Sequence, residues 1–328
     1  MTVLVLTNKR VLKKTNLRDI KKRNIKFKNW FCPIAKNAVS FSVDGNAMSG
    51  VCGNLRISTD TSPWWTKFDE IKNLLHNASN NCRISICSCG SDLLAYKSID
   101  QETYDLFVEK ANSVQDYTTL SSLTKKDEVI ALGGANKNLD FTLTLDYTKR
   151  CNYDCIYCSP FVHNNYGNFL SLEKIKKLFE CLEFKSMSNY KLNLIITGGE
   201  PTLSKELIKL VDLCYEYGFS HITINSNGTA PSALYEKLLE KNVFFIITLH
   251  EEFANKKLIE KVYKIYKENY SKVQVDMLGD DKNNRIFWNL VKSVFGLDFD
   301  SIKKQHIYYN KRIVNSIEKI KLLKARQL

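Results

Sequence analysis

The chain has 328 residues, a formal net charge of +13 and ten cysteines, and 44% of its residues are hydrophobic. This length allows a sizeable core in one large domain or two smaller ones, and no apolar run approaches the length of a membrane span. The first residues do not resemble a secretory signal, so the cysteines favour a reducing, cytoplasmic environment and metal binding over a disulfide framework.

The positive charge is concentrated at the two ends. Residues 1–30 hold ten Lys and Arg against one Asp, and residues 302–328 hold eight against one Glu. Such ends can bind nucleic acid, an acidic peptide or a membrane surface. No arginine-rich or aromatic-interleaved motif accompanies them, so we favour solvated, lysine-rich ends over a nucleic-acid-binding surface.

Residues 1–121 form a predicted cysteine-rich α+β domain. Asp44-Gly45 lies between two short alternating segments, which predicts a β-hairpin. Ser62-Pro63 precedes a predicted helix from about residue 64 to residue 76. This part contains five cysteines: Cys32, Cys52, Cys82, Cys87 and Cys89. Residues 122–139, with a Gly-Gly pair and several polar residues, are predicted to be a linker.

From residue 140 to residue 328, apolar strands alternate with amphipathic helices. We expect strands at 141–146, 192–197, 221–225, 243–249, 273–278 and 304–309. We expect helices at 171–183, 203–218, 231–241, 253–269 and 282–294. Strands joined by helices predict a parallel sheet, and six such units are too few for a closed eight-stranded barrel.

Three cysteines follow the first of these strands. Cys151, Cys155 and Cys158 have the spacing C-x3-C-x2-C. Three thiolates can hold three irons of a cubane cluster and leave the fourth iron open, as a catalytic metal site requires. A zinc knuckle would need a fourth nearby ligand, for which His163 is the candidate.

Two further motifs follow the next two strands. The run LNLIITGGEPTL ends the second strand in Gly198, Gly199 and Glu200, and TINSNGTA ends the third in Ser226 and Asn227. Glycines allow close backbone approach, and a carboxylate suits a cation. The carboxyl ends of parallel strands meet at one edge, so we expect these motifs beside the three cysteines.

Together these motifs resemble the radical S-adenosylmethionine (SAM) superfamily over residues 140–310. The resemblance implies an open three-quarter (β/α)6 barrel, a 4Fe-4S cluster on the three cysteines, and SAM bound to the open iron. It implies that Tyr157 lies near the adenine and that the Gly198–Glu200 turn receives the SAM ammonium. Ser226 and Asn227 are then expected to contact the SAM ribose or carboxylate.

The N-terminal cysteines, arranged around a hairpin and a helix, resemble a SPASM or twitch domain holding an auxiliary 4Fe-4S cluster. Those domains usually follow the barrel, and their cysteine spacing differs from the spacing here. We expect Cys32, Cys52, Cys87 and Cys89 as ligands, with Cys82 as an alternative. A zinc site uses the same residue types and stays open.

The function that the resemblance implies is reductive cleavage of SAM to a 5′-deoxyadenosyl radical, which removes hydrogen from a substrate carbon. We expect a peptide substrate, with a sugar or other small metabolite as the alternative, and a flavodoxin or ferredoxin as electron donor. His250 ends a strand and could move a proton at the substrate. An alternative of another class is a cysteine-rich, metal-stabilised nucleic-acid-binding protein.

Overall fold

The computed structural model describes residues 3–7, 10–12, 25–33, 37–49, 55–57, 62–76, 81–82, 97–110, 129–134, 140–155, 158, 164–187, 190–279 and 285–306. The chain divides into two compact units. The first comprises Met1–Leu143 and Glu180–Lys191, and the second comprises Thr144–Phe179 and Leu192–Leu328.

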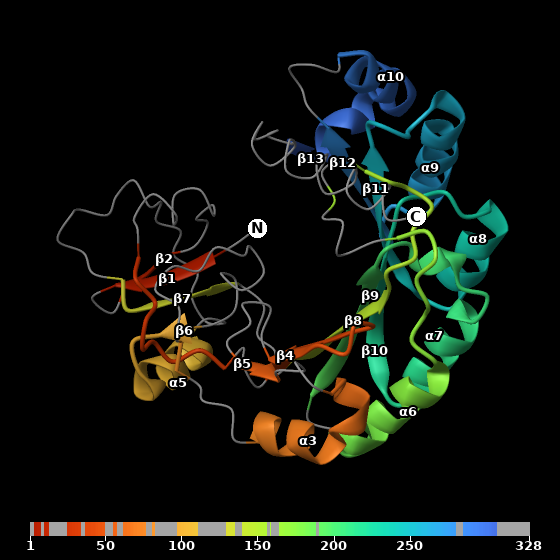
Figure 1. Ribbon diagram of the computed structural model, residues 1–328. Coiled ribbons are helices and arrows are strands. Elements are labelled where there is room, and N and C mark those ends of the chain that lie inside the picture. Colours follow the sequence, from red (N-terminus) through yellow and green to blue (C-terminus); the bar gives the residue numbers. More distant parts are fainter. Residues whose placement is uncertain are drawn as a thin grey trace, which may run out of the picture. The chain divides into compact units, whose positions relative to one another are not determined.

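The first unit contains an antiparallel sheet in the order β2-β1-β7-β6. Its strands are β1 (Val3–Thr7), β2 (Arg10–Leu12), β6 (Lys97–Ser98) and β7 (Ala131–Gly134), and α5 (Gln101–Lys110) lies beside the sheet in Figure 1. Strand β7 falls within residues 122–139, which the sequence predicted as a linker. Because Ala131–Gly134 pairs with Val3–Leu6, this segment is part of a sheet.

The predicted hairpin is confirmed in the same unit. Strands β3 (Ala38–Ser42) and β4 (Ala47–Ser49) pair antiparallel across a turn in which Gly45 has a φ of 89°. A third strand, β5 (Leu55–Ile57), pairs antiparallel with β4. Trp64 is fully buried, and its Nε1 donates to the Ser42 carbonyl at 2.8 Å. The predicted helix is present as a 3-10 turn at Trp64–Thr66 followed by α3 (Phe68–His76).

The second unit is the α/β part of the chain. Its sheet has the order β13-β12-β11-β10-β9-β8, and the neighbours from β9 to β13 pair parallel. The strands are β8 (Asp140–Thr148), β9 (Lys191–Gly198), β10 (Phe219–Ser226), β11 (Phe244–His250), β12 (Val273–Gly279) and β13 (Lys303–His306). The strand order does not return from β13 to β8 among the described residues, so the sheet is open. Residues 307–309 of the last predicted strand lie outside the described residues.

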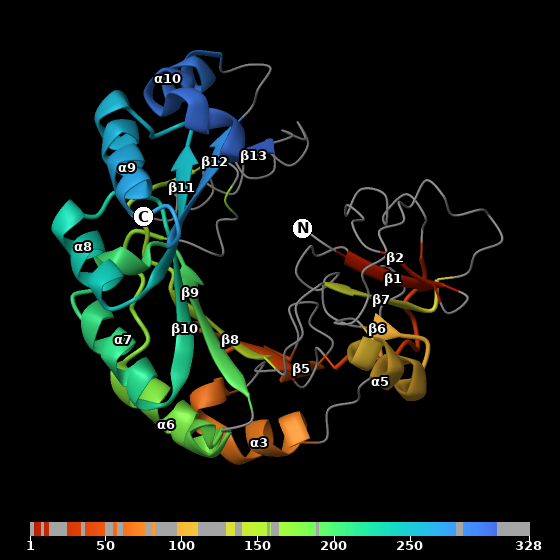
Figure 2. The same ribbon diagram turned by 180° about the vertical axis from the view of Figure 1, so that it is seen from behind.

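Five helices alternate with these strands. They are α6 (Leu172–Cys181), α7 (Leu207–Glu216), α8 (Ser232–Glu240), α9 (Lys256–Glu268) and α10 (Arg285–Phe295). Figures 1 and 2 show α7, α8 and α9 along one face of the sheet. Each helix buries residues three or four positions apart, such as Leu258, Ile259 and Val262 of α9, so the amphipathic pattern is confirmed.

The side chains of β9 and β11 alternate between buried and partly exposed, as expected for strands with two different faces. Because the paired strands are parallel, their carboxyl ends lie at one edge of the sheet. Within the described part of the chain, no helix is long and apolar enough to cross a membrane. The fold therefore gathers the ends of β8 to β12, where all of the core motifs occur.

Candidate functional site

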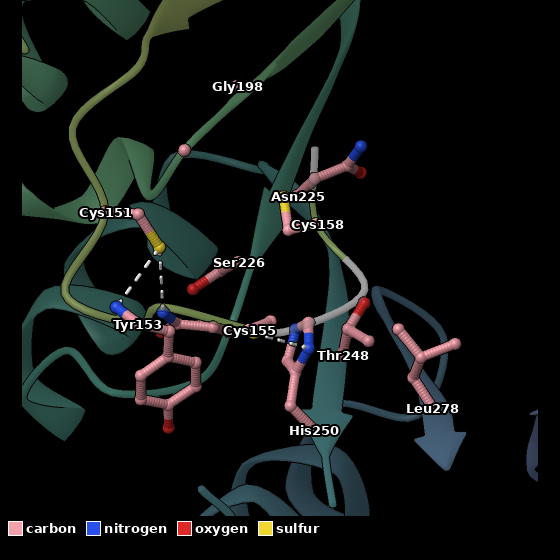
Figure 3. Close-up of a pocket in the computed structure, with 12 residues that line it drawn as sticks. Cys151, Tyr153, Cys155, Cys158, Gly198, Asn225, Ser226, Thr248, His250 and Leu278 are labelled. Atoms are coloured by element: carbon pink, nitrogen blue, oxygen red, sulfur yellow. Dashed lines mark hydrogen bonds between the residues drawn. The ribbon is translucent and has the colours of Figure 1, made fainter. Parts of the chain in front are cut away.

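A cavity of about 380 Å³ lies at these strand ends, entirely within the second unit. Figure 3 shows side chains from the cysteine loop, from β10 and from β11 around it. Its lining residues are Cys151, Tyr153, Cys155, Cys158, Gly198, Gly199, Asn225, Ser226, Asn227, Thr248, His250 and Leu278. Three motifs that are far apart in sequence thus contribute to one cavity.

The cysteine loop begins where β8 ends. The backbone N–H of Cys151 donates to Asn164 at 2.9 Å, which fixes the start of the loop, and the N–H of Cys158 donates to the Cys155 carbonyl at 3.0 Å. The Cys151 thiol accepts from the Tyr153 N–H at 3.4 Å. Burial raises the pKa of Cys151 more than this hydrogen bond lowers it. A positive metal centre would reverse that balance, because metal-bound thiols lose their proton.

The glycine turn packs against the base of the cysteine loop. Gly199 donates to the Thr148 carbonyl at 2.6 Å, and Glu200 donates to the Arg150 carbonyl at 2.7 Å. Gly198 has a φ of 121°, and a Cβ at this position would overlap the Thr148 carbonyl oxygen. A Cβ on Gly199 would likewise overlap the carbonyl of Arg150. The two glycines therefore allow this turn to lie directly against the loop that carries the cysteines.

Glu200 does not line the cavity itself, but its side chain contacts two residues that do, Ser226 and Asn227. It is fully buried, and its carboxylate accepts hydrogen bonds from Thr202 N (3.0 Å), Thr202 Oγ1 (2.5 Å), Ser226 Oγ (3.0 Å) and Asn227 N (2.6 Å). Burial raises the pKa of Glu200, and these four donors oppose the rise. Three of these hydrogen bonds end on Oε1 and one ends on Oε2, so Oε2 can accept a further hydrogen bond. These hydrogen bonds tie Glu200 to two cavity residues, Ser226 and Asn227, and the contact of Glu200 with the SAM ammonium stays a prediction.

Ser226 and Asn227 line the cavity and connect it to Glu200. The amide nitrogen of the Asn227 side chain donates to Asn152 Oδ1 at 2.9 Å and lies 4.0 Å from Cys151 Sγ. The side-chain oxygen of Asn227, Oδ1, accepts hydrogen bonds from both the N–H and the hydroxyl of Thr229. These bonds link the glycine turn, the end of β10 and the cysteine loop into one network.

Asn225 is a cavity residue that the sequence reasoning missed. Its Nδ2 donates to Thr197 Oγ1 at 3.2 Å, while its buried Oδ1 has no hydrogen-bond partner among the described residues. A buried acceptor of this kind can be satisfied by a water molecule or by a donor of a bound ligand. The alternation of β10 contains a signal, because Thr223, Asn225 and Asn227 follow each other at every second position.

His250 lies where the sequence predicted it, at the end of β11. Its Nδ1 is 3.6 Å from Cys155 Sγ, and its ring packs edge-on against the Tyr153 ring at 5.7 Å. Burial lowers the pKa of His250 to about 4. The imidazole therefore lies against one of the three loop cysteines and faces the same cavity.

Several predicted residues cannot be placed. Tyr157 lies outside the described residues, as does His163. Cys52, Cys87 and Cys89 of the predicted auxiliary site also lie outside them. Cys32 is buried and Cys82 is half-buried in the first unit. Their segments are adjacent, because Cys82 exchanges backbone hydrogen bonds with Trp30 and Asn29, and Phe31 is bridged to Asn81.

The residue types of the cysteine loop fit an iron–sulfur cluster. Among the described residues, no three His, Cys, Asp or Glu side chains lie close enough to hold one ion. In a cubane cluster each thiolate binds a different iron, so the sulfurs are spread around a volume. Cys151, Cys155 and Cys158 line one cavity together with Gly198 and Gly199, so their side chains are available to the same bound group.

Residues 145–279 match the family model of the Radical SAM superfamily. The chain contains a radical SAM domain. The match runs from the end of β8 through β12 and includes every motif of the cavity, and the open α/β sheet agrees with the fold that the resemblance implied. It does not extend into residues 1–121, so the likeness of that part to a SPASM or twitch domain stays a prediction.

Curated relatives match shorter parts of the chain. A GTP 3′,8-cyclase of Shewanella denitrificans is 41% identical over 73 residues, covering 22% of this chain and 20% of the relative. A GTP 3′,8-cyclase of Mannheimia succiniciproducens is 26% identical over 195 residues, covering 52% of each. An S-adenosylmethionine-dependent nucleotide dehydratase of Selenomonas ruminantium is 30% identical over 104 residues, covering 32% of this chain and 35% of the relative. This chain thus spans between a fifth and about half of these relatives.

Proposed function

We propose that this protein cleaves SAM reductively and uses the resulting 5′-deoxyadenosyl radical to remove hydrogen from a phosphorylated small molecule of the nucleotide class. The observation that carries the proposal is the shared cavity of Cys151, Cys155 and Cys158 with the Gly198 turn and the end of β10. When bound on these cysteines, a 4Fe-4S cluster would supply the electron and the open coordination position for SAM.

The residues of the chain orient SAM in this proposal. Asn225 Oδ1 accepts a donor of SAM, since it is buried without a partner among the described residues. Gly198 and Gly199 allow close approach of the backbone, and Tyr157 contacts the adenine. Glu200 is a positioning residue that holds Ser226 and Asn227 in place through its hydrogen bonds.

His250 has a role at the cluster that its geometry supports. A thiolate bound to iron carries no proton, so a hydrogen bond at this contact requires Nδ1–H of His250 as donor and Cys155 Sγ as acceptor. Hydrogen bonds to the sulfurs are one determinant of a cluster's reduction potential. In this tautomer Nε2 has a lone pair, but a pKa lowered to about 4 makes it a weak proton acceptor near neutral pH, and proton transfer at the substrate stays the prediction of the sequence.

The substrate class rests on the names of the relatives. Two of the three act on GTP and the third is a nucleotide dehydratase. They favour a nucleotide over the peptide that the sequence alone suggested, and a peptide is the second candidate. The radical SAM match favours an enzyme over the alternative of a nucleic-acid-binding protein. The electron donor remains a proposed flavodoxin or ferredoxin.

The test is anaerobic incubation of the reconstituted protein with SAM and dithionite, followed by measurement of 5′-deoxyadenosine. We expect 5′-deoxyadenosine in the absence of substrate and several-fold more with GTP or another nucleoside triphosphate. Transfer of deuterium from a labelled nucleotide would identify the carbon that loses hydrogen. Stimulation by short peptides but by no nucleotide would reverse the order of the two substrate candidates, and absence of 5′-deoxyadenosine under all conditions would refute the reaction.

The N-terminal cysteines are proposed to hold a second 4Fe-4S cluster. The adjacency of the Cys32 and Cys82 segments supports Cys82 as a ligand as strongly as any other member of the set. Iron and zinc analysis of a variant that lacks the three loop cysteines tests this. About four residual irons per chain support the second cluster, whereas one zinc without iron refutes it.

A further inference from the structure

A second cavity of about 570 Å³ adjoins the first, and Tyr153 lines both. It also lies entirely within the second unit, at the starts of α8 and α9. Ser232 of α8 and Lys257 and Lys261 of α9 contribute polar groups, and Phe253 stacks on Tyr153 with ring centres 4.3 Å apart. The volume is within the range of small-molecule sites in proteins.

The polar groups of this second cavity favour an anion. Its lining holds two lysine ammonium groups and the hydroxyls of Thr229 and Ser232, and none of its lining residues is Asp or Glu. The Ser232 hydroxyl and the exposed Lys257 side chain provide donors beside the apolar wall of Phe253 and Tyr153. A site with several donors and no carboxylate suits phosphate oxygens.

Lys261 is a half-buried cation in the lining of the second cavity. Its Nζ donates to the Ala230 carbonyl at 2.8 Å, and no carboxylate among the described residues forms an ion pair with it. Burial is the main cause that lowers the pKa of Lys261, while the charge of Glu200 raises it. A bound anion would restore the electrostatic stabilisation that this ammonium loses on leaving water.

Two helix N-termini add to the positive potential of this cavity. Helix α8 begins at Ser232 after Pro231, and no side chain caps its first amide groups. Helix α9 begins at Lys256 after Asn255, whose side chain accepts from Leu258 N at 3.0 Å. The amides of a first turn have no partner within their helix, and they favour negative charge at that end.

We propose that this second cavity binds the phosphate groups of the nucleotide substrate. The proposal rests on the proposed function and adds a location, because a ligand held by its phosphates at Lys257 and Lys261 can extend past Tyr153 towards the cysteine cavity. Guanosine lacks the phosphates. It would therefore lose the contacts with Lys257 and Lys261 and retain the contacts that the rest of the nucleotide makes.

Isothermal titration of the anaerobically reconstituted full chain with GTP, guanosine and inorganic phosphate tests this. One lost charge-assisted contact weakens binding by roughly tenfold to a hundredfold. GTP should therefore bind at least about tenfold more tightly than guanosine. The substitution Lys257→Ala should weaken the binding of GTP by about tenfold or more. The matched control is Lys264→Ala, an exposed lysine on the same helix that does not line the cavity, and it should leave GTP affinity within about twofold.

Equal affinities for GTP and guanosine would overturn the proposal, as would equal losses in Lys257→Ala and Lys264→Ala. Inorganic phosphate binding as tightly as GTP would indicate a site for free phosphate and would also overturn it. Thermal unfolding of each variant checks that the fold is retained. SAM cleavage by the wild type is measured separately, so failure of the radical reaction and failure of the phosphate site give different results.

Discussion

The two groups of cysteines differ in how the chain brings their side chains together. Cys151, Cys155 and Cys158 lie within eight residues of one another on a loop that follows a strand, and the hydrogen bonds of Thr148, Arg150 and Asn164 fix its base. The N-terminal cysteines come from separate segments, of which only those of Cys32 and Cys82 are described. Cysteines on one short loop are brought together by their spacing in the sequence. Cysteines on distant segments come together only if those segments pair, and the spacing of the cysteines does not encode that pairing.

Substitution of Gly198 should have the largest effect on the structure of the cysteine loop. Gly198→Ala places a Cβ against the Thr148 carbonyl at a φ of 121°. The conformation alone costs about 1–3 kcal/mol, and the overlap adds to this cost. We expect a marked fall in the free energy of unfolding and loss of iron from the loop cysteines, measured by chemical denaturation and iron analysis.

The matched control is Gly218→Ala, which also has positive φ (90°) but whose Cβ would meet nothing closer than Leu192 Cδ1 at 3.8 Å. It should show the conformational cost and retain iron. If the free energy of unfolding falls equally in both variants and both keep their iron, the close packing of the glycine turn does not stabilise the cysteine loop.

Glu200 sharpens the distinction between a residue that binds SAM and one that positions its neighbours. Glu200→Gln is nearly isosteric, but its amide nitrogen cannot accept from the Asn227 N–H. A buried donor left without a partner costs about 1–3 kcal/mol, so we expect destabilisation of that size before any SAM is added. Thermal unfolding without SAM measures it. A variant as stable as the wild type, with weakened SAM binding alone, would instead support direct contact between Glu200 and SAM.

His250 should have the smallest effect, confined to the properties of the cluster. Removing the donor to Cys155 in His250→Ala withdraws a hydrogen bond worth about 0.5–1.5 kcal/mol, which corresponds to a potential roughly 20–60 mV more negative. Potentiometric titration followed by electron paramagnetic resonance measures this shift. His250→Gln, which retains an N–H donor, should recover part of it, and an unchanged potential in His250→Ala would exclude the hydrogen bond.

The sequence predicted the strands and helices of the second unit well. The apolar residues of each element repeat with a strong period of two or of 3.6 residues, and this pattern is contained within the element itself. Errors occurred where one hydrogen bond decides a boundary: Asn255 caps α9 at Leu258, so the helix begins at Lys256 and not at residue 253. The Gly133-Gly134 segment was predicted as linker because its partner, β1, lies more than 120 residues earlier. The orientation of the Glu200 carboxylate depends on Ser226 and Asn227, which no local pattern connects to it.

The most direct test asks whether SAM cleavage depends on Cys151, Cys155 and Cys158 together. Wild type and the triple Cys→Ala variant, reconstituted anaerobically in parallel, should be incubated with SAM and dithionite and assayed for 5′-deoxyadenosine. We expect the wild type to form it and the triple variant, having lost about four irons per chain, to form none. Formation of 5′-deoxyadenosine by the triple variant at the wild-type rate would contradict this expectation.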